Sequence, residues 1–363
     1  MEADTLLAIL HLGDGRWSEA RQLQERALAV ARELADPEAL CRVGTNLMGA
    51  IWSPRQWSKL VALADELARM PRTGLRRHTV AEFTIYGSEI LLTAGERELR
   101  DALRNERIQL GTQSRDAELA PLGAQMDPGV TTLNGDLEAV VATADNRLAD
   151  GEATGTLVRA RVGAWLQVFW PLIWLGRADE LTRFDDAWLA PPVALSDLGT
   201  RALWLAHLGR LDEARAQLEE DVKDFGISAD APARSLARFL ETAVLVGHRE
   251  LAARIAPLSE GVPAWTQPTT AVTRTVGVAA QLLGNRTAAH GHHERALAWA
   301  TKIRHRPEIA LTRLAIAELL LEGTPSEQVE ALPHLDFAID EFRATKMQPS
   351  LERALRHKGL LHA

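Results

Sequence analysis

The sequence has one cysteine, Cys41, and one tyrosine in 363 residues. A single cysteine excludes an intramolecular disulfide framework and is typical of a reducing compartment. The longest apolar run, residues 163–176, is shorter than the roughly 20 residues of a membrane-spanning helix and contains a proline. The N-terminus carries acidic residues where a signal peptide needs positive ones. These absences predict a cytoplasmic protein with no membrane partner.

Signatures of catalysis and of nucleic-acid binding are also missing. No phosphate-binding loop of the pattern G-x-x-x-x-G-K-[ST] occurs. The net charge is −8, and the basic residues are spread along the chain instead of forming a cluster. Neighbouring acids such as Asp185 and Asp186 diverge around a helix and do not make a general acid and base. We expect no enzyme activity, no cofactor and no direct contact with nucleic acid.

What the sequence does contain is a glycine-centred turn that recurs along the chain, each time followed by an alanine-rich amphipathic segment. Glycine suits such a corner because it adopts a positive φ without strain. A turn that recurs at an interval of roughly 40 residues is the signature of a helical repeat array. The turn glycines are Gly15, Gly95, Gly135, Gly176, Gly209, Gly247, Gly284 and Gly323, with residues 53–57 in the equivalent place.

The segments between the turns show helical periodicity. In residues 211–225 one stripe is apolar and the opposite face is charged, which predicts an amphipathic helix. The run FTIYG at 83–87 alternates like a strand but lies within a longer helical pattern. We therefore predict an all-α, right-handed superhelix, or α-solenoid, of about nine helical hairpins. It should form one continuous domain over 1–363, with an inflection near 189–195.

The turn pattern G-x-φ-x-E-A, with an alanine seven residues further on, resembles the tetratricopeptide repeat in a longer and more degenerate form. Residues 276–323 and 331–355 are more specifically similar to the C-terminal superhelix of bacterial LuxR-type regulators and class III adenylate cyclases, and we expect residues 270–363 to match best. This resemblance implies the sensor or regulatory arm of a multidomain ATPase regulator in bacterial signalling. It carries over no catalytic residue, and the ATPase itself is absent from this chain.

The N-terminal segment is apolar on more than one side. This pattern predicts that the N-terminal end docks an upstream ATPase domain or repeat segment. The alternative is an ordinary cap that packs on the first hairpin. The residues concerned are Leu6, Leu7, Ile9, Leu10 and Leu12.

The candidates for metal binding or reactivity are a group of histidines and the single cysteine. His290 and His293 share a helical face, with His292 and His305 nearby, but no further ligand motif supports them. We expect packing or solvent-facing histidines and no metal site. Cys41 lies in an apolar helix and is expected to be a buried structural thiol.

Tryptophan is the one over-used residue type, with ten in the chain. Five of them form the candidate ligand or partner site: Trp165, Trp170, Trp174, Trp188 and Trp204. They line a groove on one interpretation and fill the core between hairpins on the other. Pro171 should kink the helix that carries the first three. We expect Trp170 and Trp174 in the core and partial exposure of Trp188 or Trp204.

Taken together, these features predict a non-enzymatic scaffold for protein–protein interaction in bacterial cytoplasmic signalling or transcriptional regulation. Its partner would be a protein or peptide, bound along a concave groove of first helices. The alternative is a sensor that encloses a small-molecule effector in a tryptophan-lined pocket.

Overall fold

The computed structural model describes Asp4, residues 7, 8, 10 and 11, and then 16–49, 52–114, 119, 127–153, 155, 157–184, 198–264 and 270–361. Within these ranges, the elements of regular structure are α-helices and 3₁₀-helices, as the sequence predicted. The run at 83–87 lies inside an α-helix. Of the helices in these ranges, none is both long and apolar enough to cross a membrane.

The chain divides into two compact units. Unit 1 comprises residues 1–126 together with residues 225–234, and unit 2 comprises residues 127–224 and 235–363. Residues 225–234 group with the N-terminal helices, although both of their flanking segments belong to unit 2. The inflection predicted near 189–195 lies outside the described residues.

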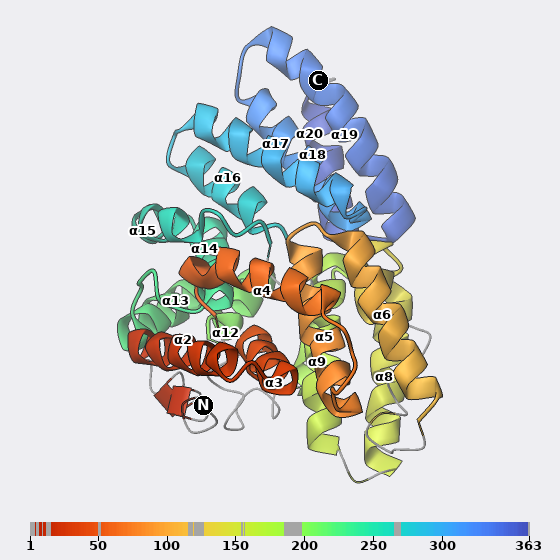
Figure 1. Cartoon of the computed structure of the whole chain (residues 1–363). Coiled ribbons are helices and arrows are strands. Elements are labelled where there is room, and N and C mark those ends of the chain that lie inside the picture. Colours follow the sequence, from red (N-terminus) through yellow and green to blue (C-terminus); the bar gives the residue numbers. More distant parts are fainter. Residues whose placement is uncertain are drawn as a thin grey trace. The chain divides into compact units, whose positions relative to one another are not determined.

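Unit 1 is built from helices that pack as successive hairpins (Figure 1). Helix α3 contacts α2, α4 and α5, and α5 in turn contacts α6. The elements are α2 (Trp17–Glu33), α3 (Pro37–Gly49), the 3₁₀-helix η1 (Pro54–Gln56), α4 (Trp57–Arg69), α5 (Arg77–Thr93) and α6 (Arg97–Thr112).

Unit 2 continues the same pattern, and its hairpins are α7/α8, α9/η3, α12/α13, α14/α15, α16/α17 and α18/α19, followed by α20. The elements are α7 (Pro128–Leu133), α8 (Leu137–Ala153), α9 (Leu157–Leu175), η3 (Ala178–Phe184), α12 (Thr200–His207), α13 (Leu211–Phe225), α14 (Ala233–Leu245), α15 (Arg249–Ser259), α16 (Val272–Leu282), α17 (Arg286–Lys302), α18 (Arg306–Leu321), α19 (Pro325–Thr345) and α20 (Gln348–Leu361).

Within the described residues, the predicted turn glycines join the two helices of a hairpin. Gly15 lies outside these residues. Gly95, Gly209 and Gly284 have φ of 84°, 76° and 88°, in the left-handed region that ends a helix without strain. The turn at Gly323 is made differently. Thr324 and Glu327 form a capping box at the start of α19, and Pro325 occupies its first turn.

One contact recurs from hairpin to hairpin in unit 2. Arg215, near the start of α13, donates from Nη2 to the carbonyl of Val246 at 2.6 Å, just beyond the end of α14. Arg249 donates in the same way to Leu282, and Arg286 donates to Leu319 at 2.8 Å. Each arginine satisfies a carbonyl at the C-terminal end of the next hairpin's first helix, where the last carbonyls have no partner within the helix. The repeat is therefore structural and not only a sequence pattern.

The hairpins of unit 2 do not contact their sequence neighbours alone. Helix α7 packs against α18, and α9 packs against α20. Arg306 Nη1 donates to the carbonyl of Asn134 at 3.2 Å, and Gly135 lies so close to Thr345 that a side chain would clash. In an open solenoid, contacts join adjacent hairpins only. In this unit the early helices α7 and α9 instead contact the late helices α18 and α20.

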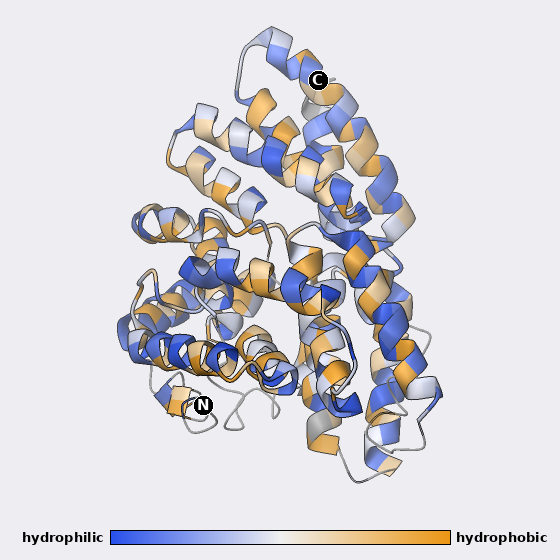
Figure 2. Ribbon diagram, viewed as in Figure 1, coloured by the Kyte–Doolittle hydropathy of each residue, from blue (hydrophilic) through white to orange (hydrophobic). Residues whose placement is uncertain are grey.

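Figure 2 shows hydrophobic and hydrophilic residues alternating along the helices, as amphipathic packing requires. In α13, Ala214 and Leu218 are fully buried as the periodicity predicted, but Leu211 is exposed. At the N-terminus, Ala8 is buried while Leu7 and Leu10 are 44% and 63% exposed. Leu6, Ile9 and Leu12 lie outside the described residues.

Candidate functional site

Four of the five tryptophans predicted as a site lie in the interior of unit 2. Trp165, Trp170 and Trp174 come from α9 and Trp204 from α12, and all four are buried. Trp204 Nε1 donates to the carbonyl of Ala178 at 2.8 Å, so of the pair in which at least one was expected to be partly exposed, this tryptophan is buried. Trp188 lies outside the described residues.

Within α9 the aromatic rings form a chain of contacts. Trp165 meets Phe169 edge-on at 5.5 Å between ring centroids, and Phe169 meets Trp170 at 5.3 Å. Trp170 and Trp174 follow at 5.9 Å, and α9 continues through Pro171 between them. These spacings are typical of packed aromatic pairs, each of which contributes beyond the area that it buries.

Two histidines connect this aromatic chain to buried charge. The ring of His207 lies edge-on to Trp170 at 5.8 Å, and its Nε2 is 3.8 Å from Oε1 of Glu241 in α14. The ring of His305 lies 6.0 Å from Trp174, and its Nδ1 accepts from the backbone amide of Glu308 at 3.5 Å. The inner residues of α9, α12, α14 and α18 therefore come together, and we call this region the centre of unit 2.

The centre contains a buried ion pair. Arg274 Nε of α16 donates to Glu308 Oε1 of α18 at 2.5 Å, and Thr312 Oγ1 donates to the same oxygen at 3.4 Å. Burial raises the pKa of Glu308. Burial alone would lower the pKa of Arg274, but the carboxylates of Glu308 and Glu241 raise it, so the guanidinium stays charged. Such a pair is costly to break because the remaining charge has no water around it.

The histidines considered as a metal site do not lie together. His290 is exposed beside Glu294, whereas His293 is fully buried against Gly277. Burial lowers the pKa of His293 to about 3, so this ring is neutral. His305 caps the next helix, α18. No group of three or more histidine, cysteine or acidic side chains within the described ranges could hold a metal ion.

Cys41 is buried in α3, as the sequence predicted. Burial raises the pKa of its thiol to about 11, against a weaker opposite effect of the hydrogen bond with Thr45. A thiol with such a pKa is protonated at neutral pH and is a poor nucleophile.

A pocket at one edge of unit 2 has mixed charge. It lies between the start of α8, the start of α18 and the end of α19, and basic and acidic side chains both line it. Arg306 is already paired with Glu341 at 2.9 Å. This balance favours no particular class of ligand.

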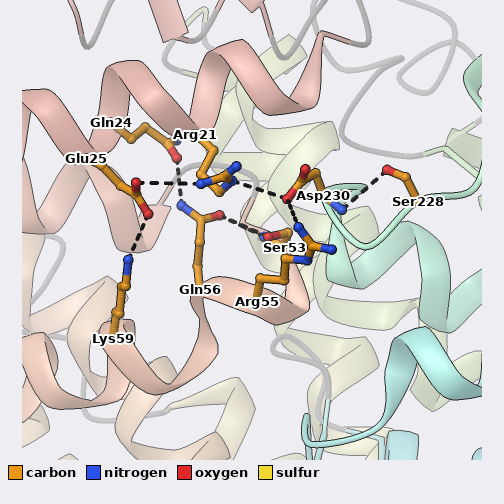
Figure 3. Close-up of polar contacts among 9 residues, drawn as sticks. All are labelled: Arg21, Gln24, Glu25, Ser53, Arg55, Gln56, Lys59, Ser228 and Asp230. Carbon is orange, nitrogen blue, oxygen red and sulfur yellow. Dashed lines mark hydrogen bonds and ion pairs between the residues drawn. The ribbon is translucent and has the colours of Figure 1, made fainter.

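Unit 1 contains a polar cluster that joins segments far apart in sequence (Figure 3). Asp230 accepts from Arg21 Nε of α2 at 3.2 Å, and Arg55 Nη1 of η1 lies 3.7 Å from the same oxygen. The backbone amide of Ala233 donates to the carbonyl of Trp52 at 2.9 Å. Arg21 and Asp230 are 209 residues apart, so residues 226–233, which we call the strap, are held on α2 and η1 by long-range contacts.

The surface that the strap contacts has its own network of hydrogen bonds and ion pairs. Gln56 Nε2 donates to Gln24 Oε1 at 3.0 Å, and the amide of Ser53 donates to Gln56 Oε1 at 3.0 Å. Lys59 Nζ donates to Glu25 Oε1 at 2.9 Å, and the other oxygen of Glu25 lies 3.6 Å from Arg21 Nη1 (Figure 3). Arg21 is thus positioned from within α2 and α4.

Sequence reasoning missed both clusters. One signal was available for the centre of unit 2, because Arg274 and Glu308 are opposite charges 34 residues apart, one repeat. The same interval joins three further pairs: Arg32 with Glu66, Lys59 with Glu25, and Arg72 with Glu106. No periodic signal connects the strap to α2.

Comparison with family models gives one short match, near the N-terminal end of the chain. A family model described as the tetratricopeptide repeat matches residues 5–38. This is the opposite end of the chain from residues 270–363, where we expected the best match. No curated protein matches.

Among solved structures, the chain is similar to "Crystal structure of APC/C hetero-tetramer Cut9-Hcn1", with 14% sequence identity and a TM-score of 0.44. The alignment covers 93% of this chain and 59% of that one, so this chain spans less than two thirds of its length. A likeness of this degree carries no argument about function. What stands is an all-α chain of helical hairpins with one tetratricopeptide-like match.

Proposed function

We propose that this chain is a non-enzymatic helical-repeat scaffold that binds a protein or peptide partner. One observation carries the proposal. The arginine-to-carbonyl contact of Arg215 recurs at Arg249 and at Arg286, one hairpin further each time. An array built from repeating units offers an extended surface on which a partner can bind through a few anchor residues.

The chemistry of the described residues supports a binding role over a catalytic one. The thiol of Cys41 is buried and has a raised pKa. The carboxylate of Glu308 accepts a hydrogen bond from Arg274. Catalysis of group transfer needs a nucleophile, a base and an orienting group within reach of one another. The buried Glu308 carboxylate of unit 2 is instead paired with a guanidinium.

Selection of peptides from a displayed random library on the full chain tests this function. We expect enrichment of one short motif, and calorimetry should then give a micromolar dissociation constant for the synthetic peptide. A selection that enriches the same sequences on blank beads as on the protein would count against a scaffold.

A second candidate is the small-molecule sensor, with Trp165, Trp170, Trp174, Trp188 and Trp204 around the effector. A specific observation favours it. Oε2 of Glu308 and both ring nitrogens of His293 are buried without a hydrogen-bond partner among the described residues. Buried polar groups normally have partners. An effector that raises the melting temperature and changes tryptophan fluorescence, with both effects lost in Trp174→Phe, would favour the sensor.

The regulatory context is a finer proposal. The resemblance of residues 276–355 to the superhelix of LuxR-type regulators and adenylate cyclases supports a bacterial, cytoplasmic signalling role beside an ATPase. The exposed Leu7 and Leu10 support docking of such a domain at the N-terminal end. Light scattering tests the docking surface. We expect self-association of the isolated chain to fall in the Leu7→Glu and Leu10→Glu variants without loss of stability, whereas destabilisation of a strictly monomeric chain would indicate a cap.

A further inference from the structure

Unit 1 binds the strap in the way that a receptor binds a short peptide. Its one carboxylate, on Asp230, lies against two arginines. The backbone amide of Ala233 donates to the carbonyl of Trp52, between α3 and η1, at 2.9 Å. Between these contacts, Ala231 and Pro232 are buried. An acidic residue followed by small apolar residues is therefore the pattern that this surface holds.

The receptor side does not depend on the strap for its shape. Arg21 Nη1 lies 3.6 Å from Glu25 Oε2 of the same helix, and Lys59 Nζ donates to the other oxygen of Glu25 at 2.9 Å. Gln24 and Gln56 are buried and bonded to each other, which joins α2 to η1. A side chain held by its own helix is pre-organised for a ligand, and pre-organisation lowers the cost of binding.

The strap itself is lightly held. Residues 226–232 form no helix or strand, and their local bonds are those of a turn. Ser228 Oγ accepts from the amide of Asp230 at 3.3 Å, and the amide of Ala231 donates to the carbonyl of Ser228 at 3.1 Å. A segment with few bonds opens locally at a smaller free-energy cost than a packed helix.

Arg55 shows that the site is not filled. Its side chain is 62% exposed, and it meets Asp230 only at 3.7 Å, beyond hydrogen-bond distance. A guanidinium offers five donors in a planar fork that matches a carboxylate. A partner with a second acidic side chain would therefore gain a contact that the strap does not make.

We propose that the surface of Arg21, Arg55 and the Trp52 carbonyl is a peptide-recognition site, occupied in cis by the strap, whose partner is an acidic peptide with small apolar residues after the acid. This rests on the proposed partner-binding function and names its site and ligand class. Because the strap belongs to the same chain, its effective concentration is of millimolar order. The strap therefore weakens the binding of a partner until it is displaced.

The test uses the full chain and a fluorescein-labelled peptide of residues 225–234, FGISADAPAR. In Asp230→Asn the strap loses its carboxylate, and we expect the peptide to bind this variant at least about fivefold more tightly than the wild type. Adding Arg21→Gln should remove that gain. Adding Arg69→Gln, which removes an equal charge from the end of α4 beside Asp65, should leave it intact. Fluorescence anisotropy measures each affinity.

The peptide carrying asparagine in place of its aspartate should bind all variants equally weakly. Equal affinity of FGISADAPAR for wild type and Asp230→Asn, or an affinity insensitive to Arg21→Gln, would overturn the proposal. If Asp230→Asn does not fold, hydrogen exchange of the wild type replaces it. Saturating peptide should accelerate exchange of the Ala233 amide, and unchanged exchange would refute displacement. Library peptides that bind elsewhere would leave the scaffold function standing while this site fails.

Discussion

The strap of unit 1 and the centre of unit 2 each hold a carboxylate with arginine, but in different surroundings. Asp230 is 17% exposed and its second arginine, Arg55, is largely in water. Glu308 is fully buried, and the side chain of Arg274 is 14% exposed. An ion pair near water contributes little and exchanges readily, whereas a buried pair is costly to break. The same chemistry thus gives a reversible contact in one unit and a fixed one in the other.

The largest effect is expected from the aromatic chain at the centre of unit 2. Trp170→Ala should lower the free energy of unfolding by about 3–5 kcal/mol, since the ring is buried and contacts Phe169, Trp174 and His207. A denaturant melt measures this. A loss below about 1 kcal/mol, the usual cost at an exposed position, would mean that the ring lines an open groove.

Breaking the buried pair should be asymmetric. Glu308→Ala leaves a guanidinium that cannot give up its proton, and we expect a loss of about 3 kcal/mol, since Glu241 still partly compensates the charge. Arg274→Ala should cost less, because a buried glutamic acid can take up a proton. Denaturant melts of the two variants at pH 7 decide, and equal losses would contradict the fixed, charged state of Arg274.

A third carboxylate sharpens the comparison, because it is bonded by amides in place of arginine. Asp221 of α13 accepts from Gln217 Nε2 at 3.0 Å, and burial raises its pKa to about 6 from 3.8, against a hydrogen bond from the Gly199 backbone. The folded state therefore holds this proton more tightly than the unfolded state. Stability falls as pH rises from about 4 to about 6, and the penalty persists above that.

Asp221→Asn removes this penalty. The shift corresponds to at most roughly 3 kcal/mol, and partial exposure reduces the expected gain to about 1–2 kcal/mol at pH 7.5. At pH 4 the variant and the wild type should melt alike. Thermal melts at both pH values test this, and a gain that is independent of pH would point to a cause other than titration.

The smallest effect is expected at the strap. Arg55→Gln should change the free energy of unfolding by less than about 0.5 kcal/mol, because its ion pair is long and solvated. Chemical denaturation of this variant beside the wild type provides the measurement. A loss as large as that of Glu308→Ala would show that the strap is a fixed part of unit 1, and the contrast between the two carboxylates would fail.

The repeat could be predicted from local sequence because its signals are local. Gly95, Gly209 and Gly284 have the positive φ that their turns required, and each precedes a helix. Ala214 and Leu218 are buried at the predicted spacing. The burial of Trp170 and Trp174 follows from the same reasoning, since α9 is apolar around much of its circumference.

The parts that sequence did not predict depend on distant pairing. Nothing near Asp230 indicates that Arg21 lies beside it, and nothing in α9 indicates that Trp174 meets His305. Leu211 was placed on the buried stripe, yet it is exposed because it begins α13 at the hairpin edge. Periodicity fixes which face of a helix is apolar but not which remote segment covers it.

The division of unit 1 between residues 1–126 and 225–234 has a consequence for biosynthesis. A ribosome completes the first segment well before it reaches the strap, and at roughly 5–20 residues per second the interval lasts on the order of 5–20 s. Throughout that interval Arg21 and Arg55 have emerged while Asp230 has not. The nascent chain therefore displays this pair of arginines without its own acidic segment, and a partner present at the ribosome would meet the surface before the strap does.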